Sequence, residues 1–128
     1  MKLACLCGHT IVDQTDHLPY KGHIIADTKI AGIYEAAGMA ESFANAIKTG
    51  ERANWIRDYF PNNREVIEMD DAAIIHDLLI CKLLDITQTI FECESCGRIA
   101  IQIGQDNHFQ FFLPEEKNVT GILKGGSE

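Results

Sequence analysis

The chain has 128 residues, of which 46% are hydrophobic and 23% charged, so it has the size and composition of one ordinary globular domain rather than a disordered or fibrous protein. Nineteen acidic against eleven basic side chains give a net charge of -8, and the basic ones are scattered singly, which disfavours nucleic acid as a partner. No apolar run approaches the roughly 18 residues of a membrane-spanning helix and no signal peptide is visible, so we expect a cytoplasmic protein without membrane contact.

The N-terminal part predicts short strands over residues 2–5, 10–12 and 22–26. Between the last two lies a segment, residues 13–20, that is rich in side chains that stabilise turns. Its Pro19 cannot donate a backbone hydrogen bond to a sheet, so we place this segment in a surface loop.

The centre of the chain predicts helices. Apolar residues recur three or four positions apart over residues 27–50, and a shorter helix is expected over 51–60. A third helix, residues 71–85, carries apolar residues around much of its circumference, which indicates deep burial. Its Cys81 is then most simply a small core residue.

The C-terminal part predicts strands again, over residues 87–93, 98–103 and 109–113. The glycine-rich end, residues 121–128, is expected to be a disordered tail. No internal repeat or linker interrupts residues 1–120, so we predict one domain over that range.

The cysteines carry the strongest chemical signal. Cys5 and Cys7 form one close pair and Cys93 and Cys96 another, and a glycine follows each pair. An odd total of five and a reducing compartment argue against stable disulfides. Thiolates at this spacing can reach one tetrahedral ion, and structural zinc prefers closed sets of four. We therefore predict a structural Zn²⁺ bound by these four cysteines.

These two cysteine turns resemble those of zinc ribbons, in which two cysteine knuckles face each other on neighbouring hairpins. The chain also resembles small bacterial proteins of uncharacterised function that open with a Cys-x-Cys-Gly turn and close with a Cys-x-x-Cys-Gly turn, over about the first 27 and the last 30 residues. The predicted strands and helices, together with this resemblance, lead us to expect an α+β fold: a small antiparallel zinc-ribbon-like sheet formed by both chain ends, with a central helical insertion packed over it.

Three alternatives stay open for the cysteines. His9 could replace one thiolate, because the spacing of Cys5 and Cys7 is shorter than in most ribbons. The cysteines could be idle core residues. Cys93 and Cys96 could be a redox pair, although such pairs precede a helix and Cys96 precedes a predicted strand.

A second polar cluster comprises Asp13, Asp16, His17 and His23, which suit loop stabilisation or a separate metal site. Two main functions follow. The first is a zinc-stabilised binding module that recognises another protein, with a basic partner favoured by the charge, as inhibitor, immunity or regulatory proteins do. The second is a small metal-dependent enzyme that uses this polar cluster. A nucleic-acid-binding ribbon is a third, disfavoured by the charge.

Overall fold

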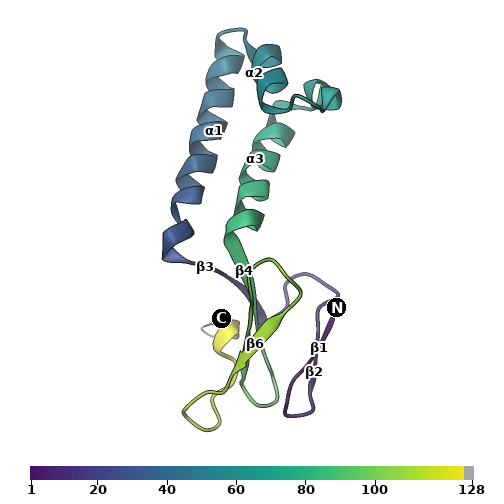
Figure 1. The fold of residues 1–128 in the computed structure, drawn as a ribbon, viewed down its shortest axis with the longest axis vertical. Helices are drawn as coiled ribbons and strands as arrows, with labels where there is room; N and C mark the ends of the chain where they lie inside the picture. Colours follow the sequence, from purple (N-terminus) through teal and green to yellow (C-terminus); the bar gives the residue numbers. More distant parts are fainter. Residues whose placement is uncertain (126–128) are drawn as a thin grey trace. The chain divides into compact units, whose positions relative to one another are not determined.

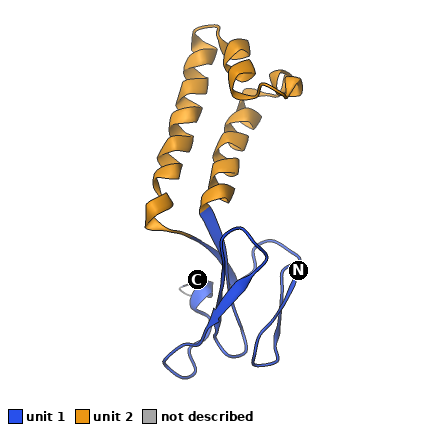
Figure 2. Ribbon diagram, viewed as in Figure 1, with its two compact units in different colours: residues 1–24, 87–128 blue, residues 25–86 orange. Residues whose placement is uncertain are grey.

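The computed structural model describes residues 1–125 and has a mixed α+β fold (Figure 1). The chain divides into two compact units (Figure 2). Unit 1 is built from both chain ends, residues 1–24 and 87 onward, and contains antiparallel strand pairs. Unit 2, Ile25–Ile86, is a helical insertion between them. This arrangement confirms the predicted fold class. That both units unfold as one domain stays a prediction.

Unit 1 begins with a small hairpin. Strands β1 (Lys2–Ala4) and β2 (Thr10–Val12) pair antiparallel, with Leu3 opposite Ile11. Ile11 is buried and packs in a core cluster with Cys5, and Leu3 packs against that cluster. The hairpin thus anchors the turn that carries the first two cysteines.

The second sheet of unit 1 has the strand order β3-β4-β5-β6. Its strands are β3 (Lys21–Ile25), β4 (Thr87–Glu92), β5 (Ile99–Gln102) and β6 (Phe109–Phe112). Phe91 pairs with Ala100, which pairs with Phe111, and all three belong to or pack against the core that contains Cys93. The second cysteine turn therefore leaves directly from the core strand β4.

The C-terminal segment is tied to β4 by a buried acid. Glu92 is 1% exposed, and its carboxylate accepts hydrogen bonds from the backbone N–H groups of Ile122 (3.1 Å) and Leu123 (3.0 Å). These residues lie in η3 (Ile122–Lys124), a short 3-10 helix. Of the segment predicted as a disordered tail, residues 126–128 lie outside the described residues.

Unit 2 contains η1 (Asp27–Lys29), α1 (Ala31–Lys48), α2 (Arg52–Tyr59), η2 (Arg64–Glu68) and α3 (Asp71–Ile86). The three predicted helices are therefore present near their expected bounds. Helices α1 and α3 pack side by side, and the core that they share with α2 includes Phe43, Ile56 and Ile74, which are fully buried. The first helix begins at Ala31 because Asp27–Lys29 form the 3-10 turn η1 instead.

The expected deep burial of the third helix is wrong. Leu79, Ile80, Leu83 and Leu84 of α3 are 42%, 39%, 41% and 64% exposed. Cys81 is exposed too, so it is not the core residue that its apolar neighbours suggested. The core that α3 shares with α1, α2 and η2 includes Ile74 and Leu78, and much of the rest of the apolar circumference of α3 stays uncovered. Within residues 1–125, no helix is long and apolar enough to cross a membrane.

Candidate metal centre

The first cysteine turn follows β1 and is closed by backbone hydrogen bonds. Cys5 donates its N–H to the carbonyl of His9 (2.9 Å), and Gly8 donates to the carbonyl of Cys5 (3.0 Å). Gly8 has a φ of 98°, a left-handed conformation that glycine adopts without steric cost. The sequence Cys5-Leu6-Cys7-Gly8 therefore forms a tight turn with both sulfurs at its tip.

The second turn joins β4 to β5 and repeats this pattern. Cys93 donates its N–H to the carbonyl of Arg98, and Gly97 donates to the carbonyl of Cys93, both at 2.8 Å. Gly97 has a φ of 80°, and a Cβ at this position would also overlap the carbonyl oxygen of Val119. Glycine is thus required here for two independent reasons, and the turn is held against the C-terminal segment.

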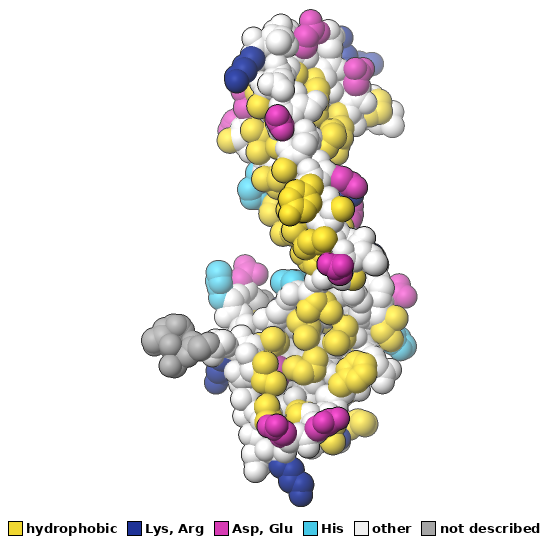
Figure 3. All heavy atoms as spheres, turned by 90° about the vertical axis from the view of Figure 1, so that its left-hand side faces the viewer, with side chains coloured by type: hydrophobic (Ala, Val, Ile, Leu, Met, Phe, Trp, Pro, Cys, Tyr) yellow, Lys and Arg dark blue, Asp and Glu magenta, His cyan; other side chains and the backbone are white. Residues whose placement is uncertain are grey.

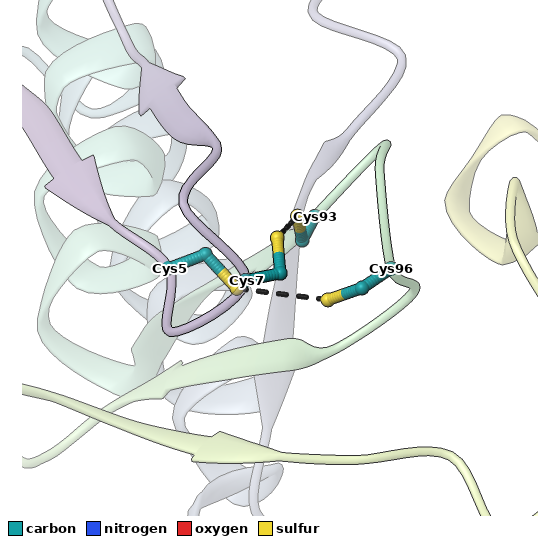
Figure 4. Close-up of side chains that lie close together, drawn as sticks. All are labelled: Cys5, Cys7, Cys93 and Cys96. Atoms are coloured by element: carbon teal, nitrogen blue, oxygen red, sulfur yellow. Dashed lines mark hydrogen bonds between the residues drawn. The ribbon is translucent and has the colours of Figure 1, made fainter.

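The two turns bring their sulfurs to one place (Figure 4). The Sγ atoms of Cys5 and Cys96 are 3.6 Å apart, as are those of Cys7 and Cys93, although 91 and 86 positions separate them in the chain. All four sulfurs lie within 4.8 Å of one another, and all four cysteines are free thiols. With Zn–S bonds of about 2.3 Å, the sulfurs of a tetrahedral zinc site are about 3.8 Å apart. The observed spacing fits such a site.

Backbone N–H groups point at the sulfurs. The donors are the N–H groups of Cys7, His9, Ser95, Cys96 and Arg98. In addition, the guanidinium of Arg98 donates to Sγ of Cys96 at 3.3 Å. Hydrogen bonds of this kind stabilise negative charge on sulfur, so the turns are built for thiolates. Five N–H donors and one cation around four sulfurs fit a metal centre better than idle core cysteines.

The four thiols differ in their acid–base properties. Burial raises the pKa of Cys5, and it raises that of Cys93 to about 12. The pKa of Cys7 is lowered by its backbone hydrogen bond. At Cys96 burial is outweighed by the hydrogen bonds from Arg98, which lower its pKa to about 6. Four thiolates this close repel one another, so all four can ionise together only around a cation, and a divalent metal supplies that charge.

The four cysteines could therefore hold one metal ion, and a closed four-thiolate set suits zinc. Among the described residues, no other group of three or more His, Cys, Asp or Glu side chains brings its ligand atoms this close. His9 stands outside the group, and it contributes to the turn through its backbone carbonyl. The second turn runs from a strand into a strand, which differs from the strand-to-helix setting of redox cysteine pairs.

The second polar cluster is partly assembled. Asp16, His17 and His23 line one open pocket of about 230 Å³ together with Lys21. The carboxylate of Asp13 instead forms an ion pair with Lys21, at 2.8 Å. These side chains are thus neighbours in the loop region, but within residues 1–125 they do not form a compact set of metal ligands.

Two residues that flank the second cysteine turn were not anticipated. Arg98 contacts the sulfur of Cys96, and a basic residue two positions after a predicted thiolate ligand was the available signal. Glu92 gave no such signal, because an acid in a strand is usually solvent-facing, whereas here its partners lie about thirty positions away.

Residues 1–116 match the model of a protein family described as "Domain of unknown function (DUF8617)". No curated protein and no solved structure matches the chain. The description of the family mentions no zinc ribbon, so that resemblance stands on the two cysteine turns alone.

Proposed function

The chain belongs to this family of unknown function, and we propose from its geometry that it is a zinc-stabilised binding module that acts through protein–protein contact. One observation carries the proposal: four sulfurs from two distant turns lie within 4.8 Å of one another. A set of this kind binds zinc as a fold element, with Cys5, Cys7, Cys93 and Cys96 as the ligands.

The role of the metal in this proposal is structural. Four thiolates fill a tetrahedral zinc site and leave no position for a substrate or a reactive water. Zinc binding to such sites contributes on the order of 10 kcal/mol, which is comparable to the net stability of a domain. The ion would therefore stabilise the association of the first cysteine turn with the second and would leave catalysis to other residues.

The charge supports a protein partner that is basic. The net charge of -8 grows more negative when four thiolates bind one divalent ion, and a strongly acidic surface steers cationic partners toward it. The same charge repels the phosphates of nucleic acids. Inhibitor-like, immunity-like and regulatory proteins are the classes that fit an acidic module without its own catalytic site.

The competing hypothesis, a metal-dependent enzyme, depends on the cluster of Asp13, Asp16, His17 and His23. Three of these line a shared pocket, but Asp13 is engaged by Lys21. An exposed polar pocket beside a loop is explained by loop stabilisation alone. The binding module is therefore the better-supported function.

Elemental analysis tests the metal, and affinity capture tests the partner. Protein purified without chelator should contain one zinc per chain, and zinc should be absent from a variant without Cys93. Capture at low ionic strength should recover a basic protein that high salt releases. Metal-free wild-type protein with full stability would refute the zinc site, and capture of no protein under any ionic condition would refute the binding role.

A further inference from the structure

Unit 2 leaves one apolar helix face uncovered. On α1, Ile33, Ala37, Ala40 and Ala44 follow one another at helical spacing beside the buried contact with α3. On α3, Leu79 and Leu83 lie beside the same contact, and with Ile33 they line a groove of about 110 Å³. We call these residues, together with Ala72 of α3, the hairpin face. Figure 3 looks onto the helical unit from the side on which α1 lies in Figure 1, and hydrophobic side chains are exposed there among charged ones.

The named residues of the hairpin face are uncharged, and the exposed imidazole of His76 lies between Ala72 and Leu79 at helical spacing. The charged side chain that reaches the groove is Lys82, and its ammonium pairs with Glu35 of α1 at 2.9 Å. On a molecule with a net charge of -8, an uncharged face is where two copies can meet without bringing like charges together. A basic partner would gain no ion pair from contact with this face, so its chemistry favours a second copy over a cationic protein.

The face is also complementary to itself in side-chain size. Helices α1 and α3 run antiparallel, because Gly32 lies against Ile86 while Phe43 shares a core with Ile74. The large side chains, Ile33, Leu79 and Leu83, therefore cluster at one end of the hairpin face, and the alanines extend toward the other. A two-fold axis that lies in the plane of the face, at right angles to the helices, would place the large end of one copy on the small end of its partner, which suits ridges-into-grooves packing.

The dimensions suffice for a specific contact. An 18-residue helix is about 27 Å long, and two helices side by side are about 20 Å wide. The hairpin face thus offers on the order of 500 Å² per copy, or about 1,000 Å² in total, which is near the lower limit for specific protein interfaces. An interface of this size is expected to dissociate at micromolar rather than nanomolar concentration.

We propose that a second copy of this chain covers the hairpin face, so that two α1–α3 hairpins form a four-helix arrangement. The inference goes beyond the proposed function, because the face lies wholly in unit 2 and contains none of the four clustered cysteines. Its outcome does not depend on whether the protein binds zinc or a heterologous partner.

Sedimentation equilibrium of the full chain tests this proposal. The measurement is made in reducing buffer so that the exposed Cys81 cannot link copies covalently. With rising concentration, the mass should climb from 14.3 kDa to twice that value. Ala37→Glu places a charge in the centre of the interface and should weaken the dimer at least about a hundredfold, because an unpaired buried charge is strongly unfavourable. Ala37 is exposed in the single chain, so the variant should still fold.

Asn45→Glu is the matched control. It adds the same charge to an exposed position of the same helix, outside the hairpin face, and should leave the dimer intact. The proposal is overturned if the wild-type chain stays monomeric at every concentration. It is also overturned if Ala37→Glu dimerises normally, or if both variants dissociate equally.

Discussion

The Sγ atom of Cys5 lies 3.6 Å from that of Cys96, across a separation of 91 positions. The contact joins the N-terminal hairpin to the turn between β4 and β5, so two chain segments that are remote in sequence share one cluster in unit 1. The stability of unit 1 should therefore depend on whatever holds these sulfurs together.

Removal of one ligand should destabilise the protein severely. Cys93→Ser leaves three thiolates, and we expect loss of bound zinc and a fall in stability of several kcal/mol, enough to unfold or aggregate the chain. The control is Cys81→Ser, which changes an exposed cysteine outside the cluster and should keep both zinc and melting temperature. Metal content and thermal unfolding measure the effect. Equal behaviour of the two variants would contradict the metal site.

The two turn glycines should differ in their tolerance of alanine. At Gly8 a Cβ has no atom within 4 Å, so Gly8→Ala carries only the left-handed backbone cost of about 1–2 kcal/mol. At Gly97 the same cost is joined by overlap with the carbonyl of Val119, so Gly97→Ala should cost clearly more. Unfolding in guanidinium compares them directly. An equal loss of unfolding free energy in the two variants would show that the close contact with Val119 does not restrict the side chain at position 97.

The two hydrogen bonds that the carboxylate of Glu92 accepts should contribute to the free energy of unfolding. In Glu92→Gln one of the two acceptor oxygens becomes an NH₂ group that faces a backbone N–H, and we expect a loss of about 1–3 kcal/mol. Hydrogen exchange should accelerate at Ile122 and Leu123 in particular. Glu94→Gln, at an exposed neighbouring position, is the control and should change neither quantity. Unchanged exchange in Glu92→Gln would argue against this anchor.

Arg98 should tighten metal binding without being a ligand. Its guanidinium donates to the sulfur of Cys96 and offsets negative charge there, so Arg98→Ala should weaken zinc affinity about 10–100-fold. Arg98→Lys keeps the charge and should recover part of the loss. Competition against a chromophoric chelator measures the affinity. Arg64→Ala, at an exposed position in unit 2, should have no effect.

Replacement of the histidines of the polar cluster should leave the zinc content unchanged. His17→Ala with His23→Ala removes two side chains of the 230 Å³ pocket but none of the four clustered cysteines, so we expect one zinc per chain as in the wild type. Elemental analysis of both proteins in parallel decides this. A second zinc in the wild type that disappears in the double variant would instead support the enzyme hypothesis.

The sequence was sufficient to predict the cysteine turns and the order of the elements. Close cysteine pairs followed by glycine have few interpretations, because turn geometry and ligand chemistry demand the same residues. Helical spacing likewise identified α1 and α3, although Asp27 proved to begin a 3-10 turn rather than the first helix.

The burial of α3 could not be predicted in the same way. An apolar circumference shows that a helix needs partners, but it does not show whether they come from the same chain, so Leu79 was expected inside and is 42% exposed. The hydrogen bonds from Ile122 and Leu123 to Glu92 could not be predicted from the sequence for another reason. They depend on the path of a long connection, and no local pattern encodes such a path.

The chain leaves unit 1 through β3 and re-enters it through β4, and these strands are hydrogen-bonded neighbours. An inserted segment that starts and ends on adjacent strands can change length without altering the strand order of the sheet, since a short reverse turn could also connect the ends of these strands. Homologous chains could lengthen, shorten or replace this segment while inheriting the sulfur cluster intact.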